Sequence, residues 1–140
     1  MPARILIADD YEDNRELLRL LLLNAEYEVL EARDGQECVD MAREHLPDLI
    51  MVDLSMPKLN GWEAVRLLQA DPRTRSIPCV VATASAEIDH ARALLSGFSA
   101  YVNKPFRTAE LLEVVGRFVD RKSGELQVVD ELSLKGKAST

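Results

Sequence analysis

The stretch DLIMVDLSMPKLNG, residues 48–61, decides the fold of this chain. Residues 49–52 form an unbroken apolar run, too short for a solvent-facing helix and typical of a strand buried on both faces of a parallel sheet. The run ends at Asp53, and open α/β sheets bind ligands outside the carboxyl ends of their strands. Taken alone, Asp53 would be read as a helix cap or a turn former. The residues that end the other predicted strands favour a functional role instead.

Short apolar runs recur along the chain, and helical patterns separate them. Strands are predicted at residues 4–8, 27–32, 49–52, 77–82 and 100–102, and helices at about 14–24, 36–45, 62–69, 86–95 and 109–121. Regular alternation of this kind implies a parallel sheet with helices on both faces. We therefore expect an α/β fold: a single, doubly wound, five-stranded parallel sheet with five helices. A chain of 140 residues fits one such domain, predicted at residues 1–121, with residues 122–140 as a C-terminal tail or the start of a linker.

Four local expectations concern the ends of the helices. Asp13 or Asn14 is expected to cap the first helix. The loop before the second strand is expected to need a left-handed residue that is not glycine, with Asn24 as the easier candidate. Gly97 is expected to end the fourth helix in a left-handed conformation, and Thr108 to cap the last helix.

Composition narrows the classes of function. Acidic residues outnumber basic ones by 24 to 17, and the net charge is −7. This balance argues against direct nucleic acid binding and against binding to an anionic membrane, because both need concentrated Lys and Arg. No signal peptide or membrane span is visible, so we expect a cytoplasmic protein. Cys38 and Cys79 lack metal-binding spacing and are expected to be small core residues in a reducing compartment.

Polar residues follow the ends of the predicted strands. These are Asp9, Asp10, Asp53, Thr83 and Lys104. The carboxyl ends of parallel strands lie along one edge of the sheet, so these residues should converge. Three carboxylates packed together repel unless a cation lies among them, and oxygen-only ligation favours Mg²⁺. Asp53 is the best candidate nucleophile because its strand is the most continuously apolar and is therefore expected to be central.

With these features the chain resembles the receiver domain of two-component response regulators, the CheY-like family with a flavodoxin-like sheet, over about residues 3–121. The resemblance rests on four motifs that each fall at a strand end. They are Asp9-Asp10, Asp53-Leu-Ser-Met-Pro-x-x-x-Gly61, Thr83-Ala84 and Tyr101-x-x-Lys104-Pro105. Each motif alone is weak, whereas all of them in order are a strong signal.

The resemblance implies a role for each of these residues. Asp53 would be the phosphoacceptor. Asp10, Asp53 and the backbone carbonyl of Ser55 would bind Mg²⁺, with Asp9 acting through water. Thr83 and Lys104 would contact the phosphoryl oxygens, and Tyr101 would be the switch aromatic.

The resemblance also implies partners and a cycle. A histidine kinase or a histidine phosphotransfer protein would donate the phosphoryl group. The face formed by the last two helices and the last strand, around Tyr101, would then control a partner protein, as a monomer or a weak dimer. In this family the residues two positions after the phosphoacceptor and two positions after the threonine influence the rate of dephosphorylation. Here they are Ser55 and Ser85, which are small and leave access for water, so we expect intermediate to fast self-dephosphorylation. The effector, the pathway and the cognate kinase do not follow from the sequence, nor does whether the domain acts alone or within a longer regulator or hybrid kinase.

Two alternatives stay open at this point. A phosphorylation-independent pseudo-receiver would be an interaction module, but it usually lacks one of the acids, the Thr or the Lys. A Mg²⁺-dependent phosphatase with an aspartyl-phosphate intermediate would need an Asp-x-Asp motif after its first strand. The sequence Asp9-Asp10-Tyr11 does not provide that motif.

Overall fold

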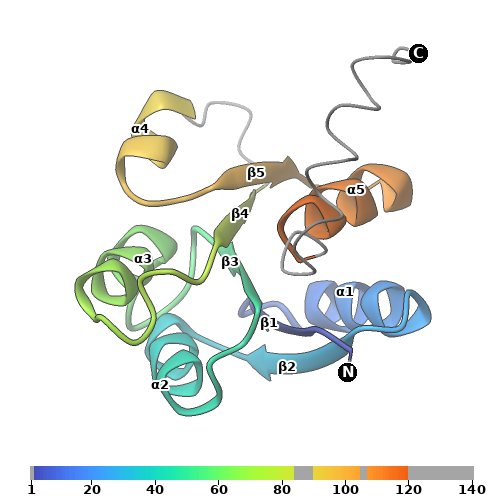
Figure 1. Ribbon diagram of the computed structural model, residues 1–140, viewed down its shortest axis with the longest axis horizontal. Coiled ribbons are helices and arrows are strands. Elements are labelled where there is room, and N and C mark those ends of the chain that lie inside the picture. Colours follow the sequence, from blue (N-terminus) through green and yellow to red (C-terminus); the bar gives the residue numbers. More distant parts are fainter. Residues whose placement is uncertain (1, 84–89, 105–106, 120–140) are drawn as a thin grey trace.

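The computed structural model describes residues 2–83, 90–104 and 107–119, which alternate between strands and helices (Figure 1). The elements are β1 (Arg4–Ala8), α1 (Glu12–Asn24), β2 (Glu28–Ala32), α2 (Gly35–His45), β3 (Leu49–Asp53), α3 (Gly61–Ala70), β4 (Cys79–Thr83), α4 (His90–Leu95), β5 (Ala100–Asn103) and α5 (Thr108–Val119). The predicted order of elements is therefore confirmed. Of the helices in the described part of the chain, none has the length and hydrophobicity needed to span a membrane.

The five strands form one parallel sheet in the order β2-β1-β3-β4-β5. The predicted α/β fold is thus confirmed. β3 lies in the middle of the sheet, and all five of its residues are buried, as the apolar run at residues 49–52 predicted. The chain leaves β1 toward β2 on one side and returns to β3 on the other. Strand order therefore reverses between β1 and β3, which is the point where open α/β sheets form a ligand crevice.

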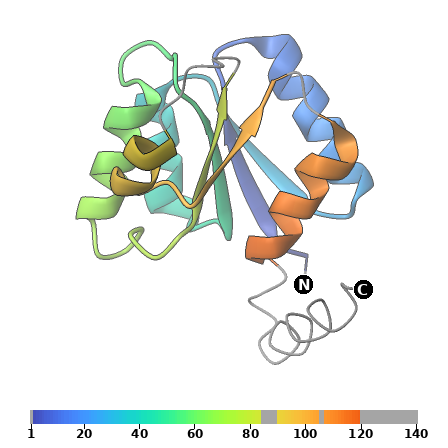
Figure 2. The same ribbon diagram turned by 90° about the horizontal axis from the view of Figure 1, so that it is seen from above.

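Helices cover both faces of the sheet, and strand residues alternate between the two cores (Figure 2). α1 and α5 cover one face, whereas α2, α3 and α4 cover the other. The core under α1 and α5 includes Ile5, Ile7, Leu18, Leu22, Met51, Leu111 and Val115. The core under α2, α3 and α4 includes Leu6, Cys38, Val39, Ile50, Val65, Leu68, Cys79 and Phe98. Cys38 and Cys79 are fully buried and unpaired, so the prediction that they are core residues is confirmed.

The start of α1 differs from the prediction. Tyr11 is the N-cap and makes no side-chain capping hydrogen bond, and the helix begins at Glu12. The prediction that Asp13 or Asn14 caps this helix was therefore wrong. Asp13 lies in the first turn, where its charge favours the positive end of the helix dipole.

The end of α1 also differs from the prediction. The left-handed residue is Glu26, with φ 74°, and not Asn24, which is the last residue of the helix. The amide of Tyr27 donates to the carbonyl of Leu22 at 3.1 Å, and the amide of Glu26 donates to that of Leu23 at 2.9 Å. This pair of bonds is a Schellman motif, which places the left-handed residue two positions after the last helical one.

The other helix ends follow the sequence more closely. Asp34 caps α2, because its side chain accepts a hydrogen bond from the amide of Glu37 at 2.8 Å. Asn60 and Glu63 form a reciprocal capping box at the start of α3, with both bonds at 2.9 Å. Gly97 has φ 112°, as expected of a left-handed residue after α4. Thr108, which was predicted to cap α5, is instead the first residue of that helix, and the carbonyl of Arg107 accepts the hydrogen bond from the amide of Leu111 at 2.9 Å.

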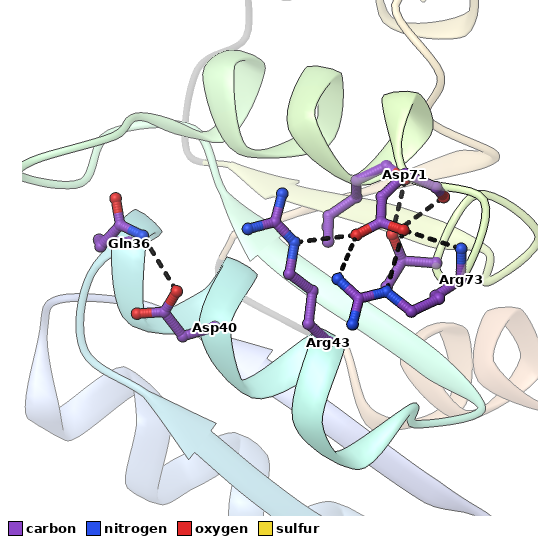
Figure 3. A network of polar contacts seen from close by, with 7 residues as sticks. Gln36, Asp40, Arg43, Asp71 and Arg73 are labelled. Carbon is purple, nitrogen blue, oxygen red and sulfur yellow. Dashed lines mark hydrogen bonds and ion pairs between the residues drawn. The ribbon is translucent and has the colours of Figure 1, made fainter.

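A polar network joins α2 to the segment that follows α3 (Figure 3). Asp71 accepts hydrogen bonds from Arg43 Nε at 3.0 Å and from the amide of Arg73 at 2.9 Å, and it also pairs with the Arg73 guanidinium. Gln36 and Asp40 bond to each other on the surface of α2. α3 begins beside the carboxyl end of β3 and runs back along the sheet. Asp71, which follows α3, therefore lies near the amino ends of the strands, at the opposite end of the sheet from Asp53. The predicted tail at residues 122–140 lies outside the described residues.

Candidate functional site

Three carboxylates meet at the carboxyl ends of β1 and β3. One oxygen from each of Asp9, Asp10 and Asp53 can be chosen so that all three lie within 4.8 Å of one another. Asp9 is 2% exposed and Asp53 is 9% exposed, whereas Asp10 is exposed to solvent. β1 and β3 are neighbours in the sheet, so the topology brings together acids that are 44 residues apart in the chain. They lie at the reversal of strand order.

Lys104 brings a positive charge to these acids from the end of β5. Its Nζ lies 2.9 Å from Asp9 Oδ2 and 3.5 Å from Asp53 Oδ1, and only 13% of its side chain is exposed. The structure thus places Lys104 against the acids, as the convergence of strand ends predicted. Because Lys104, Asp9 and Asp53 are all largely buried, the ammonium group offsets part of the repulsion between these two carboxylates.

Burial dominates the electrostatics of Asp53. It raises the pKa of this carboxyl above its ordinary value of 3.8, because a buried charge loses hydration. Lys104 opposes this effect, Asp9 adds to it, and the amide of Ser55 opposes it by donating a hydrogen bond to the carboxylate. Asp10 adds a further, smaller increase of the pKa. A cation bound among these acids would therefore favour the ionised form of Asp53.

Asp9 is held at four points. The amide of Tyr11 donates to Oδ1 at 2.9 Å and Lys104 donates to Oδ2 at 2.9 Å. The Asp9 amide donates to the carbonyl of Ala32 at 3.2 Å, and its carbonyl accepts a bond from Arg15 Nη1 at 2.8 Å. Both ends of this residue are thus fixed, which leaves its carboxylate little freedom to move.

Arg15 is the residue of the site that sequence reasoning missed. An arginine in a helix is usually exposed, although Arg15 precedes Leu18 and Leu22 by three and seven residues, a spacing that places it on their buried face. It is 9% exposed and bonds to Asp9 and to Glu31. The available signal was an arginine six residues after Asp9, with an acid near the end of the second predicted strand.

A cavity of about 730 Å³ opens beside the acids. Its lining comes from the end of β1, the loop after β3 and the start of α3, and consists of Asp10, Leu54, Ser55, Met56, Pro57, Asn60 and Trp62. Trp62 packs edge-on against Phe98 with ring centroids 5.6 Å apart, and Arg92 lies 4.3 Å above its ring. Of the three acids, Asp10 is the one that lines this cavity, so the cavity reaches the acidic cluster at Asp10.

The remaining predicted residues lie on β4, on β5 and beyond. Thr83 is the last residue of β4, but the position of its side chain lies outside the described part of the structure. Tyr101 is in β5, pairs in register with Val81 and is 36% exposed. Ser85, with Ala84 and Pro105, lies outside the described residues.

The donor set suits a hard divalent cation. The acids offer oxygen ligands only, and Asp10 and Ser55 also line the open cavity, where water and a phosphate could complete the coordination of Mg²⁺. Among the described residues no cysteine or histidine belongs to this cluster, which disfavours a softer metal. The residues therefore fit a magnesium site.

Comparison with known proteins agrees with this geometry. The family model for the response regulator receiver domain matches residues 5–116. The polar-differentiation response regulator DivK of Brucella anthropi is 36% identical over 120 residues, which cover 85% of this chain and 98% of that protein. DivK of Brucella ovis is 35% identical over the same shares of the two chains.

Two solved structures share the fold. The receiver domain of the sensor histidine kinase PA1611 from Pseudomonas aeruginosa, with a magnesium ion coordinated in its active site cleft, has a TM-score of 0.80 and 29% identity, covering 86% of this chain and 99% of that one. The chemotaxis protein CheY4 of Vibrio cholerae has a TM-score of 0.79 and 27% identity, with 84% and 99% covered. The acidic cluster at the strand ends and the family match agree: this chain belongs to the response regulator receiver domain family, whose members are phosphoacceptors of two-component signalling and not conventional enzymes.

Proposed function

We propose that Asp53 is the phosphoacceptor of this receiver domain and takes its phosphoryl group from a phosphohistidine of a histidine kinase or a phosphotransfer protein. The observation that carries the proposal is the position of Asp53. It ends the central strand, lies with Asp9 and Asp10 in one cluster, and has Lys104 Nζ 3.5 Å from its carboxylate. Asp9 is the more buried acid, and both of its carboxylate oxygens already accept hydrogen bonds, so it is the poorer nucleophile.

The transfer follows from this arrangement. A carboxylate oxygen of Asp53 attacks phosphorus, the bond from phosphorus to the histidine nitrogen breaks, and its electron pair stays on the imidazole. Lys104 holds its ammonium group beside the attacking carboxylate, where it stabilises the negative charge on the phosphoryl oxygens. Bound Mg²⁺ would supply further stabilisation of that charge, held by Asp10, Asp53 and the Ser55 carbonyl, with Asp9 acting through water.

The acyl phosphate then shifts a two-state equilibrium. Thr83 at the end of β4 and Lys104 after β5 contact the phosphoryl oxygens, and Tyr101 changes its packing as Thr83 moves. The half-exposed position of Tyr101 in β5 supports this role, because a partner protein can read it from solvent. Phosphorylation thereby controls how the face of α4, β5 and α5 binds a partner protein. The domain itself acts as a monomer or a weak dimer. The similarity to DivK supports a DivK-like response regulator.

Three further parts of the proposal concern the domain as a whole. The receiver domain spans residues 1–121, with residues 122–140 as a tail or a linker, and it works in the cytoplasm. Water removes the phosphoryl group at an intermediate to fast rate, because Ser55 and Ser85 are small. A phospho-form that persists for many hours would contradict this rate.

Intact-mass analysis after incubation with Mg²⁺ and acetyl phosphate tests the proposal. We expect one phosphoryl adduct on the wild type that requires Mg²⁺, that is absent in Asp53→Asn and that is strongly reduced in Lys104→Ala. The Arg43→Ala variant, which loses an ion pair at the opposite edge of the sheet, serves as the control and should be modified like the wild type. A folded wild type that gains no adduct would instead indicate a phosphorylation-independent interaction module.

A further inference from the structure

We propose that Arg15 is a positioning residue for the metal-binding acids, held in turn by Glu31, and that this pair sets the affinity of the site for Mg²⁺. The inference rests on the proposed magnesium site and goes beyond it by assigning two residues outside the acidic cluster. Neither residue contacts the phosphoryl group in this account. Both act through the backbone that carries Asp9 and Asp10.

Arg15 has a buried guanidinium that bonds to two partners. Its side chain is 10% exposed, its Nη1 donates to the Asp9 carbonyl at 2.8 Å and its Nε donates to Glu31 Oε1 at 3.4 Å. The other oxygen of Glu31 lies 3.3 Å from Nε of Arg19. Glu31 is therefore fixed by two arginines of α1 and fixes Arg15 in turn. A buried arginine is costly unless it is paired in this way.

The atom that Arg15 binds explains its effect on the site. The Asp9 carbonyl belongs to the peptide group that joins Asp9 to Asp10, and this group is planar. The hydrogen bond from Arg15 therefore restricts rotation about the bonds on both sides of it, and these rotations decide where the two carboxylates lie. Tyr11 and Lys104 fix the side chain of Asp9. Arg15 fixes the peptide group between Asp9 and Asp10, which those two contacts leave free.

Net charge must be held constant to test this role, because removing Arg15 alone would also make the site more negative and favour a cation. The double variant Arg15→Met/Glu31→Gln removes one charge of each sign and keeps the aliphatic part of the arginine side chain. Arg15→Lys also conserves charge, but an ammonium group cannot span both partners as the guanidinium fork does.

A matched control lies at the opposite edge of the sheet. Arg43→Met/Asp71→Asn likewise removes one charge of each sign and breaks an ion pair of 3.0 Å between Nε and Oδ2 (Figure 3). That pair, like the one between Arg15 and Glu31, joins two elements of the fold. A positioning role predicts weaker Mg²⁺ binding in Arg15→Met/Glu31→Gln, whereas loss of the positive charge beside Asp9 would strengthen it.

The experiment is isothermal titration of each full-length protein with MgCl₂ at fixed ionic strength, beside thermal unfolding. We expect Arg15→Met/Glu31→Gln to bind Mg²⁺ about 10-fold to 100-fold more weakly than the wild type, as is typical when a partner of a metal ligand is removed. The Mg²⁺ affinity of Arg15→Lys should lie between that of the wild type and that of Arg15→Met/Glu31→Gln. Arg43→Met/Asp71→Asn should be less stable but bind Mg²⁺ as the wild type does.

Equal affinity in the wild type, Arg15→Met/Glu31→Gln and Arg15→Lys would overturn the proposal. If the double variant does not fold, Arg15→Lys decides alone, since it keeps the charge and most of the packing. The titration contains no phosphodonor and therefore does not depend on phosphorylation. If the wild type binds Mg²⁺ in the titration but accepts no phosphoryl group from acetyl phosphate, the proposed function is contradicted and the test of Arg15 remains valid.

Discussion

Gly61 is the position where a single methyl group should disturb the site most directly. A Cβ atom added there would lie 2.6 Å from the carbonyl oxygen of Asp53 and 2.9 Å from Cα of Leu54. Both are backbone atoms, so no side-chain rotation can relieve the contact. The amide of Gly61 also donates to the carbonyl of Leu54 at 2.9 Å, which holds α3 close to the end of β3.

The size of the effect follows from these distances. To reach an ordinary contact of 3.4 Å, the Gly61→Ala variant must separate its Cβ from the Asp53 carbonyl oxygen by about 0.8 Å more. Overpacking of this kind costs about 1–3 kcal/mol, and the better helix propensity of alanine returns at most about 1 kcal/mol. We expect a net loss of about 1–2 kcal/mol in the free energy of unfolding, or a Tm lower by roughly 2–8 °C.

The functional loss should exceed the loss of stability. A misplacement of about 1 Å in a reacting group costs about 100-fold in rate, so we expect Gly61→Ala to accept phosphoryl groups from acetyl phosphate at least about 10-fold more slowly. Gly97→Ala is the matched control. Its φ of 112° makes alanine strained, but its contacts are with Gln69 and Val65, away from the acids.

Stopped reactions sampled by intact mass would give the rates, and thermal unfolding would give the stabilities. Gly97→Ala should be destabilised and still react at the wild-type rate below its Tm. A Gly61→Ala protein that is as stable and as reactive as the wild type would refute the argument that this close approach fixes Asp53.

Two further predictions concern acid sensitivity and thiol chemistry. The pKa of Asp71 is lowered from 3.8 to about 2, first by the hydrogen bond from the Arg73 side chain, then by the Arg73 amide and by the charges of Arg73 and Arg43. Because the folded state lowers this pKa, the ionised Asp71 carboxylate stabilises the fold above pH 3.8, and this contribution is lost as the pH falls toward 2. Asp71→Asn should therefore be less stable than the wild type at pH 7 in denaturant unfolding, and the difference should shrink over that window; a difference independent of pH would contradict it. Burial raises the pKa of Cys79 to about 12 and also raises that of Cys38. Both thiols should react with a thiol reagent only as fast as the protein unfolds, and rapid labelling of the native protein would show that the core is open.

The central strand and the place of the acids could be predicted because they depend on short-range pattern and topology. An apolar run of four residues that ends in Asp53 specifies a buried strand and the side chain at its end. Parallel pairing then brings Asp9 and Lys104 to the same edge, because all strands of such a sheet end on one side. These conclusions need no knowledge of individual side-chain contacts.

The parts that could not be predicted depend on contacts between elements. Arg15 has the helical spacing of the buried Leu18 and Leu22. A buried arginine needs partners, however, and only the fold brings Asp9 and Glu31 to it. The left-handed residue after α1 is Glu26 because two backbone hydrogen bonds form there, and they override the intrinsic preference of Asn24. At both positions, hydrogen bonds formed in the folded chain outweigh the intrinsic preference of the residue.

Locating the phosphoryl group is the most direct test of the central claim. The protein would be incubated with Mg²⁺ and acetyl phosphate and then treated with borohydride, which reduces an acyl phosphate of aspartate to homoserine. Fragment-ion mass spectrometry would then identify the changed residue. The account predicts homoserine at position 53 alone and no change in a sample without Mg²⁺. Homoserine at position 9 or 10, with Asp53 unmodified, would contradict it.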